Sequence, residues 1–139
     1  MPQLRRAVAT LRVVGDELLP EEISSLLGAE PTQAQRKGQQ FPSKSPSGAR
    51  IARTGLWRLS ATDTETGNVD TQVFELLDQL TPDLGIWNDL SQQYKVDLFC
   101  GWFMGSSNDG VGISSRTLLA LGKRGIELAM DLYGPDEDA

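Results

Sequence analysis

The chain has 139 residues and a net charge of −6, with 39% hydrophobic and 23% charged residues, which is typical of one globular domain. It holds one cysteine and no histidine, which excludes an intramolecular disulfide, His-containing catalytic triads and the common zinc sites. No apolar run approaches the roughly 20 residues of a membrane span, and the N-terminal residues lack the apolar segment of a signal peptide, so we expect a cytoplasmic protein without membrane contact.

The chain begins with a predicted strand and a predicted helix. Residues 7–14 are rich in β-branched side chains and are apolar at every odd position, which predicts a strand with its odd positions toward the core. Residues 20–27 predict a helix, because Pro20 suits its first turn and Gly28 suits its C-terminal cap. The apolar stripe of this helix is expected to be Ile23, Leu26 and Leu27.

Residues 32–53 follow neither the helical nor the strand period and contain no acid. Because they include the tract PSKSPSG, we interpret them as a flexible basic loop. The remainder of the chain is acidic, with four Lys/Arg and fourteen Asp/Glu in residues 59–139. Such a domain repels a polyanion, so nucleic-acid binding is not expected. The cations of the loop are Arg36, Lys37, Lys44, Arg50 and Arg53.

The middle of the chain predicts a strand and two helices. Residues 55–62 alternate and predict a second strand, whereas residues 70–80 and 83–90 have the helical period. Thr81 suits the N-cap of the second helix, with Pro82 at its first position. The residues expected to face the core are Trp57, Leu59, Ala61, Val73, Phe74, Leu77, Leu80, Ile86, Trp87 and Leu90.

Residues 94–104 predict the longest strand. Its even positions are apolar, and beyond Phe99 the odd positions become apolar too, which indicates that the end of the strand is covered on both faces. Gly101 between two bulky residues predicts a bulge or a close backbone approach. We interpret Cys100 as a buried packing residue, not a nucleophile, because free cysteines are commonly buried.

The polar turn at residues 105–110 is expected to fold a short strand, residues 111–113, back onto the long one. Ser114 or Ser115 then caps a helix that ends at Gly125. Its apolar residues are Leu118, Leu119 and Leu121.

Residues 126–133 alternate again and predict the last strand, and residues 134–139 form an acidic tail expected to be disordered. The whole order predicts one α+β domain over residues 1–133. We expect a two-layer sandwich with a mixed sheet of about five strands and helices on one face, distantly ferredoxin-like.

Four segments resemble a known bacterial family, the domain of unknown function 4279. They are VVGDELLPEEISSLLGAEPTQAQRKG, GLWRLS, FELLDQL and LLALGKRGIELAMDLYG, and the resemblance covers roughly residues 8–133. It implies an α+β fold and a bacterial cytoplasmic protein. The family has no established activity, so the resemblance assigns no functional residue.

If helices cover one face of the sheet, the other face displays charged and aromatic side chains from four strands. They fit a solvated face with ion pairs or a recognition face. Asp97 with Glu127 or Asp131 is a candidate carboxylate pair, but no motif sets their spacing, and we expect neither metal nor cofactor. The candidate binding residues are Arg12, Arg58, Lys95, Asp97, Phe99, Phe103, Glu127 and Asp131.

We favour a non-enzymatic module that binds a protein partner or itself through the open face and the basic loop, with an immunity-type role as one form. One alternative is a domain or unrecognised enzyme that grips a small anionic ligand with Arg12 and Arg58. Another is a structural homodimer that buries the end of the sheet at Phe99 and Phe103.

Overall fold

The computed structural model describes most of the chain, namely residues 4–42, 48, 50–62, 68–104 and 111–134. The predictions for Lys44, for the turn at residues 105–110 and for the tail beyond residue 134 lie outside this part. None of the helices in the described residues is long and apolar enough to cross a membrane.

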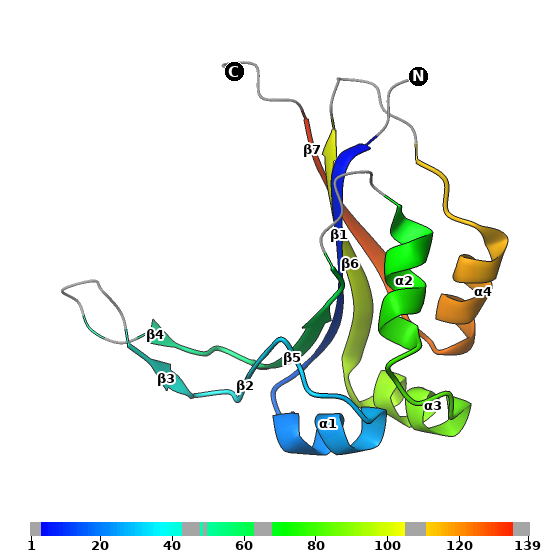
Figure 1. The fold of residues 1–139 in the computed structure, drawn as a ribbon. Coiled ribbons are helices and arrows are strands. Elements are labelled where there is room, and N and C mark those ends of the chain that lie inside the picture. Colours follow the sequence, from blue (N-terminus) through cyan, green and yellow to red (C-terminus); the bar gives the residue numbers. More distant parts are fainter. Residues whose placement is uncertain (1–3, 43–47, 49, 63–67, 105–110, 135–139) are drawn as a thin grey trace.

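Five strands form one mixed sheet in the order β2-β5-β1-β6-β7, in which only the β6–β7 pair is parallel. Four helices cover one face of it (Figure 1), which confirms the α+β two-layer sandwich. The strands are β1 (Leu4–Gly15), β2 (Gln33–Gln35), β5 (Gly55–Ser60), β6 (Lys95–Met104) and β7 (Glu127–Tyr133). The helices are α1 (Pro20–Leu27), α2 (Val69–Leu77), α3 (Leu84–Gln93) and α4 (Ser115–Lys123).

Residues 32–53, which show no periodic sequence pattern, contain three short strands. β2 adds an edge to the main sheet, and β3 (Gln40–Phe41) pairs with β4 (Arg50–Ile51) in a separate hairpin. In Figure 1 this hairpin projects on the side of the sheet opposite to α2 and α4. Strands of two or three residues are too short to show a period of two, so the sequence pattern did not reveal them.

Two predictions about the second half of the sheet are wrong. Residues 111–113 form no strand, and the chain instead passes through α4 to β7, which pairs parallel with β6. The irregularity in the β1–β6 pairing lies between Leu4 and Arg6, whereas Gly101 stays in regular register opposite Val8.

The alternation along β1 and β6 determines the core. Ala7, Ala9, Leu11 and Val13 are each at most 1% exposed, as expected for the odd positions of β1. On β6, Cys100 is fully buried, which confirms its packing role, and this burial raises the pKa of the thiol to about 11. At neutral pH Cys100 therefore remains an unreactive thiol.

Three leucines expected to be inward are exposed, because their helices are rotated relative to the predicted stripe. Leu118 and Leu119 of α4 are 50% and 58% exposed, and Leu26 of α1 is 44% exposed. In α4 the N-cap region docks on α2 through polar groups: Thr117 Oγ1 donates to Asp70 Oδ1 at 2.7 Å. This contact turns Thr117 inward and the leucines outward.

Other helix predictions differ in detail. The N-cap of α3 is Asp83, whose carboxylate accepts from the Gly85 amide, and not Thr81. Phe74 of α2 is only half-buried, with the Arg116 guanidinium 4.1 Å from its ring centroid. Ser114 caps α4 as expected.

Gln72 of α2 completes the hydrogen bonding of β1 where its pairing with β5 ends. β5 pairs with β1 only from Thr10 onward. Beyond that point the Gln72 side chain accepts from the Ala9 amide at 2.6 Å and donates to the Ala7 carbonyl at 2.7 Å. A fully buried side chain thus replaces the missing strand, which joins the helix layer to the central strand.

We expect Gln72→Leu to lower the free energy of unfolding by about 2–4 kcal/mol, because it leaves two buried backbone groups without these partners. Urea denaturation of the variant measures the loss. Gln92→Leu, on the exposed face of α3, is the matched control and should change stability by less than about 0.5 kcal/mol. Equal stability of the two variants would contradict the role of Gln72.

Candidate binding site on the open sheet face

The face of the sheet that the helices leave open contains a hollow of about 230 Å³. Its lining comes from four neighbouring strands, so it depends on the complete sheet and not on one loop. The lining residues are Val8, Thr10, Arg12, Arg58, Phe99, Gly101, Phe103 and Tyr133. The structure therefore brings together four of the eight residues expected on this face, namely Arg12, Arg58, Phe99 and Phe103.

Arg12 and Asp97 form an ion pair on the open face of the sheet. They lie opposite each other on β1 and β6, and Arg12 Nε and Nη2 donate to the two Asp97 oxygens at 2.8 and 2.7 Å. Arg12 also lies over the ring of Phe99, 4.5 Å from its centroid. The hydrogen bonds to Asp97 raise the pKa of Arg12 above its ordinary value. Asp97 is only 2% exposed, so its carboxylate is committed to this pair.

Arg58 lies opposite Arg12 on β5 and provides the less committed cation of the hollow. Its Nη2 donates to Gln33 Oε1, whereas its buried Nε has no hydrogen-bond partner among the described residues. Because Asp97 neutralises Arg12, the positive charge of Arg58 dominates this part of the hollow. The guanidinium of Arg58 lines the hollow, where it would pair with an acceptor oxygen of a ligand.

Stacked rings form the other wall. Phe103 and Tyr133 stack with centroids 4.7 Å apart, and Tyr133 donates from its hydroxyl to Asp131 at 2.8 Å. This hydrogen bond raises the pKa of Tyr133. A Cβ at Gly101 would lie 3.7 Å from both rings, so the absence of a side chain leaves part of the hollow beside them.

Two of the three carboxylates expected on this face, Asp97 and Asp131, accept hydrogen bonds from neighbouring side chains. Glu127 lies opposite Asp97 in the β6–β7 register, but the Asp97 oxygens are held by Arg12. Asp131, opposite Gly101, accepts the hydrogen bond from Tyr133. Lys95 and Glu127 are both exposed. Within the described ranges, no three Asp, Glu, Cys or His side chains gather at a position that could hold a metal ion.

The basic residues of the hairpin region lie away from the hollow. Arg36 pairs with Glu21, and Lys37 pairs with Asp16 at 3.2 Å. Arg50 lies over the Phe41 ring, 4.8 Å from its centroid. Arg53 is exposed.

Sequence reasoning missed four lining residues, Val8, Thr10, Gly101 and Tyr133. The alternation of each strand could have identified them, because each has the same strand parity as a charged or aromatic residue on the open face. Val8, Thr10 and Gly101 were passed over because their small, uncharged side chains carry little chemistry of their own.

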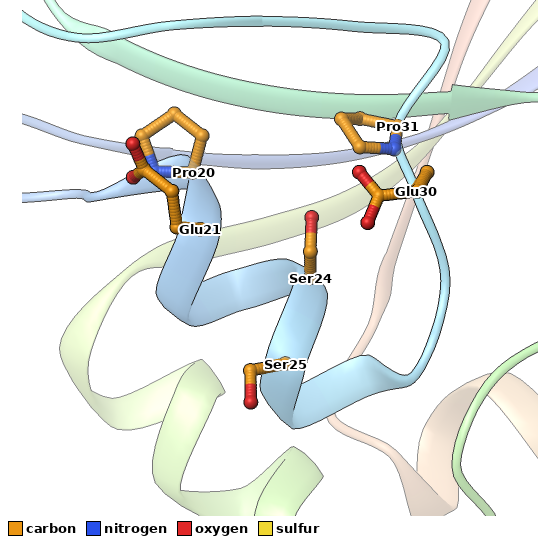
Figure 2. A pocket seen from close by; sticks show the side chains of 6 residues that line it. All are labelled: Pro20, Glu21, Ser24, Ser25, Glu30 and Pro31. Atoms are coloured by element: carbon orange, nitrogen blue, oxygen red, sulfur yellow. The ribbon is translucent and has the colours of Figure 1, made fainter.

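A second hollow, of about 360 Å³, lies beside α1 (Figure 2). Ser24 and Ser25 point in opposite directions there, and Ser24 Oγ accepts from the indole of Trp57 at 3.0 Å. Glu21 is engaged by Arg36. This hollow offers neither an aromatic wall nor a cation in its lining, so the hollow on the open face is the better candidate binding site.

Comparison with known proteins yields one match. A family model described as "Domain of unknown function (DUF4279)" matches residues 3–135. Neither a curated protein nor a solved structure matches the chain. All residues that line the hollow lie within the matched range.

We expect Arg12→Met to lower the free energy of unfolding by about 2–3 kcal/mol, because it leaves the buried Asp97 carboxylate unpaired. The value is below that of a fully buried pair, since the Arg12 side chain is 32% exposed. Adding Asp97→Leu should recover at least about 1 kcal/mol in a double-mutant cycle measured by urea denaturation. Lys95→Met, on the exposed neighbouring position, is the control. Strictly additive losses would show that the pair contributes nothing.

Proposed function

The chain belongs to the DUF4279 family of domains of unknown function, and we propose that it acts as a non-enzymatic protein-interaction module that binds its partner through the open sheet face. The observation that carries this proposal is the hollow itself, which combines the guanidinium of Arg58 with a wall of aromatic rings. Arginine and aromatic residues are the types most enriched at the energetic centres of protein interfaces.

The size of the hollow favours one side chain of a partner. About 230 Å³ is below the roughly 300–1,000 Å³ of typical small-molecule pockets. A carboxylate of the partner would accept from Arg58, and adjoining apolar atoms would pack on Phe103 and Phe99. The partner segment that fits best is therefore acidic with a neighbouring apolar or aromatic residue.

The hairpin of β3 and β4 enlarges the surface available to such a partner. It projects on the open side of the sheet (Figure 1) and carries Arg50 stacked on Phe41. Arg53, near its base, is exposed. An acidic partner seated on the open face would meet these cations as well. Neutralising a toxin by covering its surface is one role that such a module fits.

We expect Arg58→Glu to abolish capture of a partner that the wild-type protein recovers in a pull-down from the source cells, because it places a carboxylate in the hollow. Lys123→Glu makes the same charge change on α4, on the helix-covered side, and should leave capture intact. Asp97 is unsuitable for this test, since it is buried and its replacement would disturb the fold. Equal capture by wild type and Arg58→Glu would contradict the proposal.

The guanidinium of Arg58 also supports a second candidate function, the binding of a small anionic ligand. An aromatic carboxylate such as benzoate would stack on the rings and accept from Arg58. Here benzoate should raise the melting temperature of the wild type but not of Arg58→Ala, and benzyl alcohol, which lacks the charge, should raise neither. The absence of any benzoate effect on the wild type would argue against this alternative.

A further inference from the structure

β7 leaves one edge of the sheet without a neighbour among the described residues. It is the terminal strand in the order β2-β5-β1-β6-β7 and pairs only with β6. Natural sheet edges are commonly protected by proline, lysine, bulges or covering loops. The β7 sequence, ELAMDLY, contains neither proline nor lysine, and its two charges, Glu127 and Asp131, share the strand parity of Tyr133 on the open face.

Exposed apolar side chains flank this edge. On β7, Met130 and Leu132 are 49% and 57% exposed, although their strand parity places them on the helix side of the sheet. On α4, Leu118 is 50% exposed and lies about 200° around the helix axis from Arg116. Because Arg116 lies over Phe74 of α2, Leu118 is directed away from α2.

The order of residues in β7 makes this edge complementary to itself. An antiparallel pairing about Met130 is the register in which all seven residues, Glu127–Tyr133, find a partner. It places Leu128 opposite Leu132 of the second copy, and Met130 opposite its own equivalent. Because each residue pairs with one of the same parity, the helices of both copies lie on the same side of the joined sheet.

The charges favour the same register. About Met130, Glu127 faces Tyr133 and Asp131 faces Ala129, so carboxylates do not oppose each other. Shifting the two-fold axis by one residue to Ala129 places Glu127 directly opposite Asp131, and centring it on Asp131 places two carboxylates face to face. Like charges directly opposite destabilise a strand pair, so the register of greatest overlap is also the one without repulsion.

We propose that a second copy of this chain binds at the β7 edge, in antiparallel register about Met130, and extends the sheet into a continuous two-fold symmetric one. The Met130 and Leu132 side chains then pack across the two-fold axis, below α4 and its exposed leucines. This inference goes beyond the proposed function, because it concerns the edge of the sheet and not the hollow on its open face.

Sedimentation equilibrium across the micromolar range tests the association. The wild type should have twice the monomer mass of 15.2 kDa, and Met130→Lys should have the monomer mass, because it opposes two lysines at the axis. Met130 is half-exposed, so this variant should fold, which circular dichroism checks. Ile51→Lys, at a 57% exposed site on β4, is the matched control and should remain dimeric. A monomeric wild type would overturn the proposal.

Disulfide trapping tests the register. Opposed Cα atoms in an antiparallel pair are about 4.5–5.5 Å apart, within the range of a disulfide, so oxidised Met130→Cys should form a covalent dimer. Leu132→Cys should not, since its equivalent in the second copy lies about 14 Å away along the strand. The native Cys100 is buried and does not interfere. A dimer that survives Met130→Lys would show that another surface associates. Trapping of Leu132→Cys but not of Met130→Cys would overturn the register about Met130.

Discussion

The open face of this protein depends on one ion pair between its two central strands. A carboxylate on a sheet face is expected to meet solvent, yet Asp97 is 2% exposed because Arg12 grips both of its oxygens. The pair bridges β1 and β6 at the centre of the sheet and holds the guanidinium over Phe99. Arg12 thereby becomes part of the wall of the hollow, and Asp97 neutralises its charge.

The neutralisation of Arg12 by Asp97 determines which charge the open face presents to a ligand. With Arg12 neutralised, Arg58 can lie directly opposite it on β5 at little electrostatic cost and contribute its positive charge to the hollow. Phe103 and Tyr133 stack on each other and form the aromatic wall of the same hollow. A cation, a ring surface and a space left open by Gly101 are the components of a recognition site, and all of them are held by strands.

Buried and part-buried hydrogen bonds connect the helix layer to the central strand and connect two of its helices to each other. Gln72 joins α2 to β1, and Thr117 joins α4 to α2 through Asp70. The second contact turns the leucines of α4 outward. Tyr133 belongs both to β7 and to the hollow, so a partner at the edge would adjoin the site on the open face.

Much of the fold could be predicted, because strand alternation and helix caps are local signals. The odd positions of β1, the burial of Cys100, the Ser114 cap and the left-handed Gly28 and Gly125 all agree with the sequence pattern. The errors arose where distant groups decide the outcome. Leu118 faces outward because of a carboxylate on another helix, and residues 111–113 form no strand because β7 takes the position beside β6.

The sequence by itself determined which side of each long strand is apolar, and hence that the domain is a two-layer α+β sandwich with four of the hollow's residues on its open face. Only the tertiary structure decided how these residues combine. It paired Asp97 with Arg12, placed Arg58 at the hollow, brought Tyr133 onto Phe103 and placed β7 at the edge of the sheet. The physical reason is that side-chain periodicity is a local property of the backbone, whereas ion pairing, stacking and strand order depend on which strands become neighbours.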